Sequence, residues 1–190
     1  MVDKTNQIVQ ASINVFVKKG YVGTTTKEIA EKAKVAEVTL YRKFGTKKHL
    51  FEYCINSLAL DKFNVVINLD NCLNPFDFTK QLLDNRLLVI SKNIKVVRML
   101  ISESLLGNLP KELRFTNVIF NQVYSSIKEY FEKEDINLDS QAFAKIIGGI
   151  LLGYAILPND KSYNTLSKTE KEIYLNNYLD IIFNNNTKIG

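Results

Sequence analysis

Hydroxyl and cationic side chains gather within residues 24–51, TTTKEIAEKAKVAEVTLYRKFGTKKHLF. Thr39, Arg42 and Lys43 lie on one short helical pattern, and Lys47 and Lys48 follow it at once. All of these side chains donate hydrogen bonds and the Lys and Arg side chains also carry positive charge, so phosphates and the acceptor atoms of base edges can bind them. A short helix with cations at its exposed end suits insertion into the major groove of DNA.

Two apolar patterns beneath these side chains predict a helix-turn-helix. Ile29, Ala30 and Ala33 form an apolar edge at i, i+1 and i+4 on the first helix. Val35 lies between the helices, where one apolar residue is needed to fix the crossing angle. The apolar residues expected to carry the second helix are Val38, Leu40, Tyr41 and Phe44. The sequence therefore predicts two short amphipathic helices joined by a tight turn.

Residues 5–51 resemble the DNA-binding domain of the TetR family of bacterial transcription repressors. The resemblance includes a preceding helix with Ala11, Phe16 and Gly20, the Thr-rich entry, IAEKA, VTLYRKF, and the basic pair before Leu50. The pattern TLY-x-x-F, followed by a helix that starts with lysine, is more specific than a generic helix-turn-helix.

Four residues depart from the usual pattern of this family. Lys34 stands where the turn often has Gly, Ala36 where Ser is common, Val38 where Gly is frequent, and Lys43 where His or Tyr is usual. Lys34 is expected to adopt a positive φ, and Ala36 cannot cap the second helix with a hydroxyl. The base specificity of known family members is therefore not transferred to this chain.

The resemblance also implies roles for individual side chains. Tyr41 is expected to donate its hydroxyl to a phosphate, and Lys47, at a helix N-terminus, to pair with a phosphate. Thr26 and Lys27 open the helix that crosses the DNA backbone, so they are also expected to contact phosphates. The candidates for contacts with base edges are Glu37, Thr39, Arg42 and Lys43. For Tyr41 the alternative is a core aromatic, and for Lys48 and His49 it is an ordinary exposed residue.

The distribution of charge supports a polyanionic partner for the N-terminal part of the chain. Residues 1–50 carry ten Lys and Arg against four acids, a net charge of +6. The remainder carries 15 basic and 16 acidic residues, a net charge of −1, within a total of +5. A basic head on a nearly neutral body favours contact with nucleic acid at the head alone.

The rest of the chain is expected to be helical, giving an all-α fold of nine helices in the TetR-like arrangement. Three Pro and eight Gly in 190 residues predict long helices. The predicted head spans residues 1–46 and the predicted effector-binding and dimerisation body spans residues 47–190. Gly20 ends the first helix and Thr25 or Thr26 caps the second. The helices outside the helix-turn-helix are expected at about 5–19, 47–68, 76–92, 95–107, 110–133, 140–157 and 167–185.

Residues 143–157, FAKIIGGILLGYAIL, are apolar on nearly every face, which requires burial on every face. In a helical chain of this size such a helix must pack on its own body and on another copy, so a homodimer is expected. The family resemblance implies the same four-helix interface. Gly149 and Gly153 offer a smooth stripe for this contact, although a packing role inside one chain is equally open. The interface residues expected are Ile146, Gly149, Ile150, Gly153, Tyr154, Leu175, Tyr178, Leu179 and Ile182.

The family resemblance implies an effector pocket in the body, and many aromatic residues between positions 53 and 130 are compatible with one. Polar residues within apolar helical stretches are candidates for orienting a small apolar or aromatic ligand. The alternatives for them are internal ion pairs or a solvated face. The ligand-binding candidates are Phe63, Arg86, Arg98, Glu103, Phe120, Asn121 and Tyr124.

Enzymatic and membrane functions are not expected. The single histidine excludes a multi-histidine metal centre, and the sequence has no Gly-rich phosphate loop or G-x-S-x-G motif, so no catalytic residue, metal or cofactor is expected. Cys54 and Cys72 lie outside any CxxC motif. The longest uncharged apolar run, residues 146–157, is too short to span a bilayer, and the N-terminus lacks the apolar core of a signal peptide. A cytoplasmic protein is expected.

The favoured interpretation is a dimeric regulator, a repressor in most such cases, that binds a palindromic operator in double-stranded DNA and is released by a small-molecule effector. One alternative is a dimeric helical ligand-binding or interaction protein whose DNA-binding head is vestigial. Activation in place of repression is also open, because the position of the operator relative to the promoter decides it.

Overall fold

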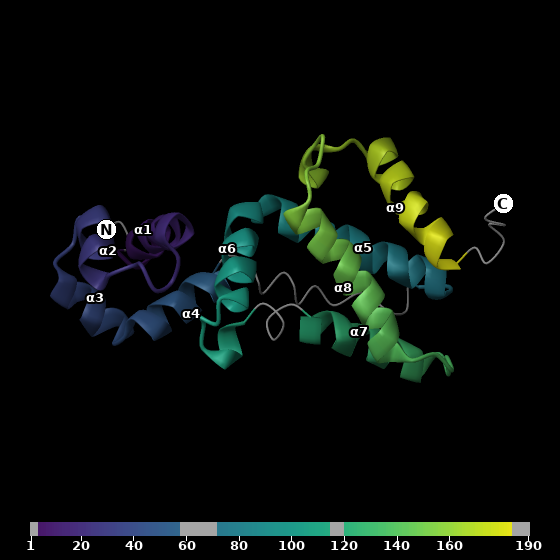
Figure 1. The fold of residues 1–190 in the computed structure, drawn as a ribbon, viewed down its shortest axis with the longest axis horizontal. Helices are drawn as coiled ribbons and strands as arrows, with labels where there is room; N and C mark the ends of the chain where they lie inside the picture. The colour runs from purple at the N-terminus through teal and green to yellow at the C-terminus, as the bar shows by residue number, and fades with distance from the viewer. Residues whose placement is uncertain (1–3, 58–71, 115–119, 184–190) are drawn as a thin grey trace. The chain divides into compact units, whose positions relative to one another are not determined.

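The computed structural model describes residues 4–57, 72–114 and 120–183, and in these ranges the chain is helical without strands. The helices of the N-terminal part are α1 (Lys4–Lys19), α2 (Thr26–Lys32), α3 (Glu37–Phe44) and α4 (Lys47–Ser57). They are followed by α5 (Pro75–Lys92), α6 (Ile94–Leu105), α7 (Asn121–Lys133), α8 (Ser140–Ile156) and α9 (Lys168–Phe183), with short 3₁₀ helices at Lys111–Leu113 and Tyr163–Thr165 (Figure 1). The predicted all-α class with nine helices is confirmed for the described part of the chain.

The chain divides into two compact units. The first comprises Met1–Lys62 and Asn93–Val118, and the second comprises Phe63–Lys92 and Ile119–Gly190. The first unit therefore holds α1–α4 together with α6, and the second holds α5 and α7–α9. The predicted boundary at residue 46 separates a DNA-binding head from an effector-binding body, whereas these two units are defined by how the helices pack. The functional boundary therefore stays a prediction.

In the first unit, α1 is the central element and contacts α2, α4 and α6. Its buried face presents Ile8 and Phe16, and the Phe16 ring meets the Phe51 ring of α4 edge-on at a centroid distance of 4.8 Å. α1 ends at Gly20, whose φ of 73° and hydrogen bond to the Phe16 carbonyl match the predicted helix-ending glycine. This core fixes the base on which the helix-turn-helix is built.

In the second unit, α5 packs against α8 and α9, and α7 packs against α8. The Phe78 ring of α5 stacks on the Tyr130 ring of α7 with centroids 4.0 Å apart. Phe143 of α8 extends this aromatic cluster through its contacts with Phe131 and Phe183. Large aromatic surfaces supply much of the burial that holds a helical body together.

Most predicted helices outside the helix-turn-helix are confirmed to within a few residues, and one is wrong at its start. Residues 110–114 do not begin the helix predicted at 110–133, because Pro110 and Arg114 have extended backbones, with ψ of 145° and 143°. A 3₁₀ turn lies between them and α7 begins at Asn121. The predicted helix at 47–68 is present as α4 to Ser57, and its remainder lies outside the described residues. Within the described ranges, none of the helices has the length and apolar character needed to cross a membrane.

Candidate nucleic-acid interface

The turn between α2 and α3 has the conformation that the sequence predicted. Lys34 adopts a φ of 52°, in the left-handed region that favours glycine. The backbone N–H of Val35 donates to the Ala30 carbonyl at 3.0 Å, which closes the turn. Ala36 occupies the N-cap of α3 in an extended conformation and makes no side-chain capping bond, as expected for alanine.

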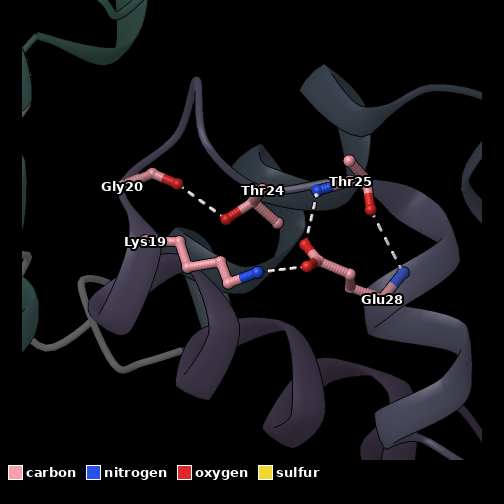
Figure 2. Close-up of polar contacts among 5 residues, drawn as sticks. All are labelled: Lys19, Gly20, Thr24, Thr25 and Glu28. Atoms are coloured by element: carbon pink, nitrogen blue, oxygen red, sulfur yellow. Dashed lines mark hydrogen bonds and ion pairs between the residues drawn. The ribbon is translucent and has the colours of Figure 1, made fainter.

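The start of α2 is fixed by a complete capping box. The Thr25 hydroxyl accepts from the Glu28 N–H at 3.2 Å, and the Glu28 carboxylate accepts from the Thr25 N–H at 3.3 Å (Figure 2). The same carboxylate pairs with Lys19 at the end of α1, and this contact is the main cause of the lowered pKa of Glu28. Thr24 donates its hydroxyl to the Gly20 carbonyl at 2.6 Å. These contacts set the direction in which α2 leaves α1.

Three predicted DNA-contacting residues form one hydrogen-bonded group between α2 and α3. The Thr26 hydroxyl donates to the Glu37 carboxylate at 2.7 Å, and the Tyr41 hydroxyl lies 3.1 Å from the Thr26 oxygen. Tyr41 remains 48% exposed, so its ring is not a core aromatic. The group ties the two helices together at the side where α3 begins.

The ammonium groups of Lys47 and Lys43 also contact protein oxygens. The Lys47 Nζ donates to the carbonyls of Tyr21 at 3.0 Å and Thr24 at 3.1 Å, and it lies 4.7 Å from the centroid of the Tyr21 ring. The Lys43 Nζ donates to the Thr5 hydroxyl on α1 at 2.6 Å. In this structure both lysines hold the frame of the helix-turn-helix together.

The face of α3 opposite its buried side presents Val38 and Arg42, and Thr39 is half-buried beside them. Lys27 is exposed at the start of α2. The placement of Val38 with Leu40 on the apolar side of the helix is wrong. Residues two positions apart on a helix are separated by about 200°, so the two side chains point in nearly opposite directions. Leu40 is fully buried and Val38 is 71% exposed. Counting this rotation along the sequence was the signal that could have identified Val38 as a surface residue.

The backbone of Tyr21 is bound from two helices, a feature that the sequence did not reveal. Its N–H donates to the Glu103 carboxylate of α6 at 2.9 Å, while its carbonyl accepts from Lys47 of α4. A Cβ at Gly20 would lie 2.6 Å from a Glu103 oxygen, so only glycine allows this close approach. Glu103, predicted as a ligand-binding residue, is thus buried against the α1–α2 turn.

The remaining ligand-binding candidates are divided between the two units. Arg86 of α5 is almost completely buried, and its burial lowers the pKa of the guanidinium to about 10. Phe120 lies beside α8, because its ring would be 3.3 Å from a Cβ at Gly148. Tyr124 is half-buried and Asn121 is exposed.

The last two ligand-binding candidates lie outside the described part of the second unit. Arg98 is exposed on α6 and belongs to the first unit. Phe63 lies outside the described residues. A common pocket for all of the candidates therefore stays a prediction.

The predicted dimer residues fall into two groups. Most of them line one surface groove, namely Ile146, Gly149, Ile150, Gly153, Tyr154 and Tyr178. Leu175 and Leu179 are buried within the chain itself, and Ile182 is half-buried near the end of α9. The apolar helix α8 is thus buried on one face only in a single chain, with Phe143, Ala144, Ile147, Leu151, Tyr154 and Ala155 inside.

The helix-turn-helix with its cationic surface and the helical body together define a transcriptional regulator of the helix-turn-helix class. The family model for bacterial regulatory proteins of the tetR family matches residues 8–54. The chain is 42% identical over 60 residues to the HTH-type transcriptional regulator YvkB of Bacillus subtilis, a match that spans 32% of each protein. It is 24% identical over 151 residues to IcaR of Staphylococcus aureus, a negative regulator of the biofilm operon icaADBC, covering 75% of this chain and 77% of IcaR.

Solved structures extend the similarity to the whole fold. A candidate fatty acid metabolism regulator of Clostridium perfringens matches with a TM-score of 0.69 and 25% identity, over 92% of this chain and 97% of that one. AibR, solved with isovaleryl coenzyme A and operator DNA, has the same fold with a TM-score of 0.67 and 18% identity, over 94% and 97%. Residues 8–54 therefore match the DNA-binding domain of the tetR family of bacterial regulatory proteins, and the chain shares its overall fold with solved bacterial regulators.

The contacts of Lys47 predict a loss of stability when its charge is removed. Lys47→Met keeps most of the aliphatic stem but removes both donors to the Tyr21 and Thr24 carbonyls. We expect the free energy of unfolding, measured by urea denaturation, to fall by about 1–2 kcal/mol.

Lys48→Met is the matched control for this measurement. Lys48 is the next residue of α4, and its ion pairs with Glu52 and Glu112 are 3.9 and 3.6 Å long and partly solvated. Removing them should cost no more than about 0.5 kcal/mol. Equal effects of the two substitutions would show that Lys47 does not hold the turn.

Proposed function

We propose that this protein is a ligand-responsive repressor that binds a palindromic DNA operator as a homodimer and is released by a small apolar or aromatic effector. The observation that carries the proposal is the outward face of α3. It presents Arg42 to solvent and leaves Thr39 half-buried, while Thr26, Glu37 and Tyr41 fix its orientation against α2. A rigid short helix with an exposed polar face suits readout of base edges in the major groove.

The proposed DNA contacts divide into positioning and readout. Lys27 is exposed at the N-terminal end of α2. The backbone N–H groups at this end of the helix and the positive charge of Lys27 both favour a phosphate. Arg42 has the two parallel donors that match the O6 and N7 acceptors of guanine. Tyr41 and Lys47 remain proposed phosphate contacts, and Glu37 and Lys43 remain proposed base contacts, although these four side chains already contact protein groups.

The division between positioning and readout predicts different results for two substitutions. Lys27→Ala should weaken binding to all duplexes similarly and make the slope of log K against log[salt] shallower by about one unit. Arg42→Ala should instead relax the preference at one base pair in each half-site, by about 1–3 kcal/mol. Both are measured by titration of the full-length protein against a duplex recovered from a randomised library, at several salt concentrations.

Lys32→Ala serves as the control, because this substitution removes the same charge from an exposed position at the other end of α2. If Lys27→Ala and Arg42→Ala altered affinity and specificity in the same way, the proposed division would be incorrect. A wild-type protein that bound every duplex equally would support the alternative of a vestigial head.

The proposed dimer rests on the apolar surface that α8 and α9 leave uncovered in one chain. Ile146 and Leu157 are 53% and 60% exposed, and both line the groove that contains Gly149 and Gly153. These four residues follow one stripe of α8 at helical spacing. A stripe of this kind on a soluble protein marks an interaction surface, and a two-fold contact would bury it in both copies.

Gly149→Leu should weaken the dimer without disturbing the fold of the chain. A Cβ at Gly149 would meet no heavy atom within 4 Å in the single chain, so the substitution begins in open space and is expected to obstruct a partner. We expect the dissociation constant, measured by sedimentation equilibrium, to rise about tenfold or more. Lys128→Leu, on the exposed side of α7, should leave it unchanged. A wild-type monomer at micromolar concentration would contradict the proposed architecture.

The proposed response to an effector has support from connectivity and from related proteins. A single residue, Asn93, separates α5 of the second unit from α6 of the first. Glu103 on α6 and Lys47 on α4 both bind the Tyr21 backbone, so movement of either helix displaces the turn that leads into α2. AibR binds isovaleryl coenzyme A as well as DNA.

Compounds that raise the melting temperature of the protein should weaken operator binding by about 5–150-fold, the range that a coupling of 1–3 kcal/mol gives. Glu103→Ala should retain the thermal shift but show less release of DNA, because α6 loses its bond to Tyr21. Glu112→Ala, which removes an exposed carboxylate, should behave as the wild type. Ligands that stabilise the protein but leave operator affinity unchanged would contradict the coupling.

A further inference from the structure

We infer that Val38 determines operator specificity by contacting the 5-methyl group of a thymine in each half-site. The inference rests on the proposed function, since it assumes that α3 enters the major groove. It names a readout residue that the sequence pattern grouped with the apolar residues of the second helix. Three observations support it: the hydrogen bonds that neighbouring side chains make within the protein, the position of Val38 on α3, and the apolar character of the valine side chain.

Two of the four base-edge candidates are bound to other parts of the head. The Glu37 carboxylate accepts from Thr26 at 2.7 Å, and the Lys43 ammonium donates to Thr5 at 2.6 Å. These bonds hold the Glu37 and Lys43 side chains toward Thr26 and Thr5, so only their remaining hydrogen-bonding capacity is available to a base. The side of α3 that faces away from Leu40 is therefore presented by the exposed Val38 and Arg42, and Thr39 is half-buried at its edge.

The position of Val38 suits a direct base contact. It is the second residue of α3, and in helix-turn-helix proteins the N-terminal residues of the recognition helix reach base edges. Its side chain is 71% exposed, so it contributes little to the core of the head. One exposed valine alone would need no explanation. Its location in the first turn of this helix, on the same side as Arg42, is what assigns it a role.

The chemistry of valine restricts what Val38 can recognise. Its side chain neither donates nor accepts a hydrogen bond, and the C5-methyl of thymine is the apolar group that base pairs present in the major groove. Burying one such group corresponds to about a fourfold change in affinity per half-site. Val38 and Arg42 are four residues apart, about 6 Å along the helix surface. The thymine and a guanine read by Arg42 should therefore lie within about two base pairs.

The test replaces thymine by deoxyuridine, which removes only the methyl group. A duplex is first recovered from a randomised library with the full-length protein, and each thymine is then replaced in turn. At one position in each half-site, deoxyuridine should weaken wild-type binding about fourfold. Val38→Ala removes the contact in both half-sites, so it should bind the thymine duplex with the affinity that the wild type shows for a duplex carrying deoxyuridine at that position in both half-sites. It should also be insensitive to the replacement.

Two further variants separate Val38 from its surroundings. Thr39→Ser removes a methyl from the neighbouring half-buried residue and should keep the full sensitivity to deoxyuridine. Val22→Ala makes the same truncation at a valine that is 62% exposed outside α3, and it should bind as the wild type. Melting temperatures of all variants verify that the head remains folded, which the exposure of Val38 leads us to expect.

The outcomes distinguish this inference from the proposed function. Failure to enrich any duplex would contradict sequence-specific binding, and the role of Val38 with it. An enriched duplex that the wild type binds equally with thymine or deoxyuridine at every position would overturn the Val38 assignment alone. So would a Val38→Ala variant with undiminished sensitivity, or a Thr39→Ser variant that loses it.

Discussion

The two-sided binding of the Tyr21 backbone is the constraint on which the head depends. Glu103 accepts from its N–H and Lys47 donates to its carbonyl, so α6 and α4 hold the same peptide segment between α1 and α2. The charged partners make these hydrogen bonds stronger than bonds between neutral groups. Gly20 is needed beside them, because any side chain there would occupy the space of the Glu103 carboxylate. The orientation of α2, and through Thr26 that of α3, follows from this arrangement.

The same arrangement separates side chains that shape the head from those that face outward. A helix that reads DNA must keep its position while its exposed side chains exchange water for bases, which favours a frame fixed before binding. Thr26 and Glu37 join α2 to α3, and Lys43 joins α3 to α1. Arg42 and Val38 lie outside these contacts at the surface. Specificity can then change through the exposed residues while the frame is retained.

Local features of the head could be predicted from the sequence, whereas distant contacts could not. The capping of α2 by Thr25, the termination at Gly20 and the positive φ of Lys34 depend on a few adjacent residues, and each was expected. The bond between Glu103 and Tyr21 joins residues 82 positions apart, which periodicity does not reveal.

Two errors had local causes. The apolar type of Val38 predicts the buried side of α3, whereas its angle on the helix, about 200° from Leu40, places it at the surface. The break at Pro110 was read as a helix start, which a proline permits but does not require. The apolar character of α8 on nearly every face is visible in the sequence. Which of its apolar residues face the chain's own body depends on how α5 and α7 pack against the helix.

Hydroxyl-radical footprinting of the full-length protein on a duplex selected from a randomised library tests the central claim most directly. A dimer with one recognition helix per copy predicts two protected patches, related by a dyad and separated by one helical turn of DNA, about 34 Å, or a multiple of it. The protection should weaken evenly as salt is raised. A single protected patch, or uniform protection along the duplex, would contradict the account of this protein as a dimeric reader of a palindromic operator.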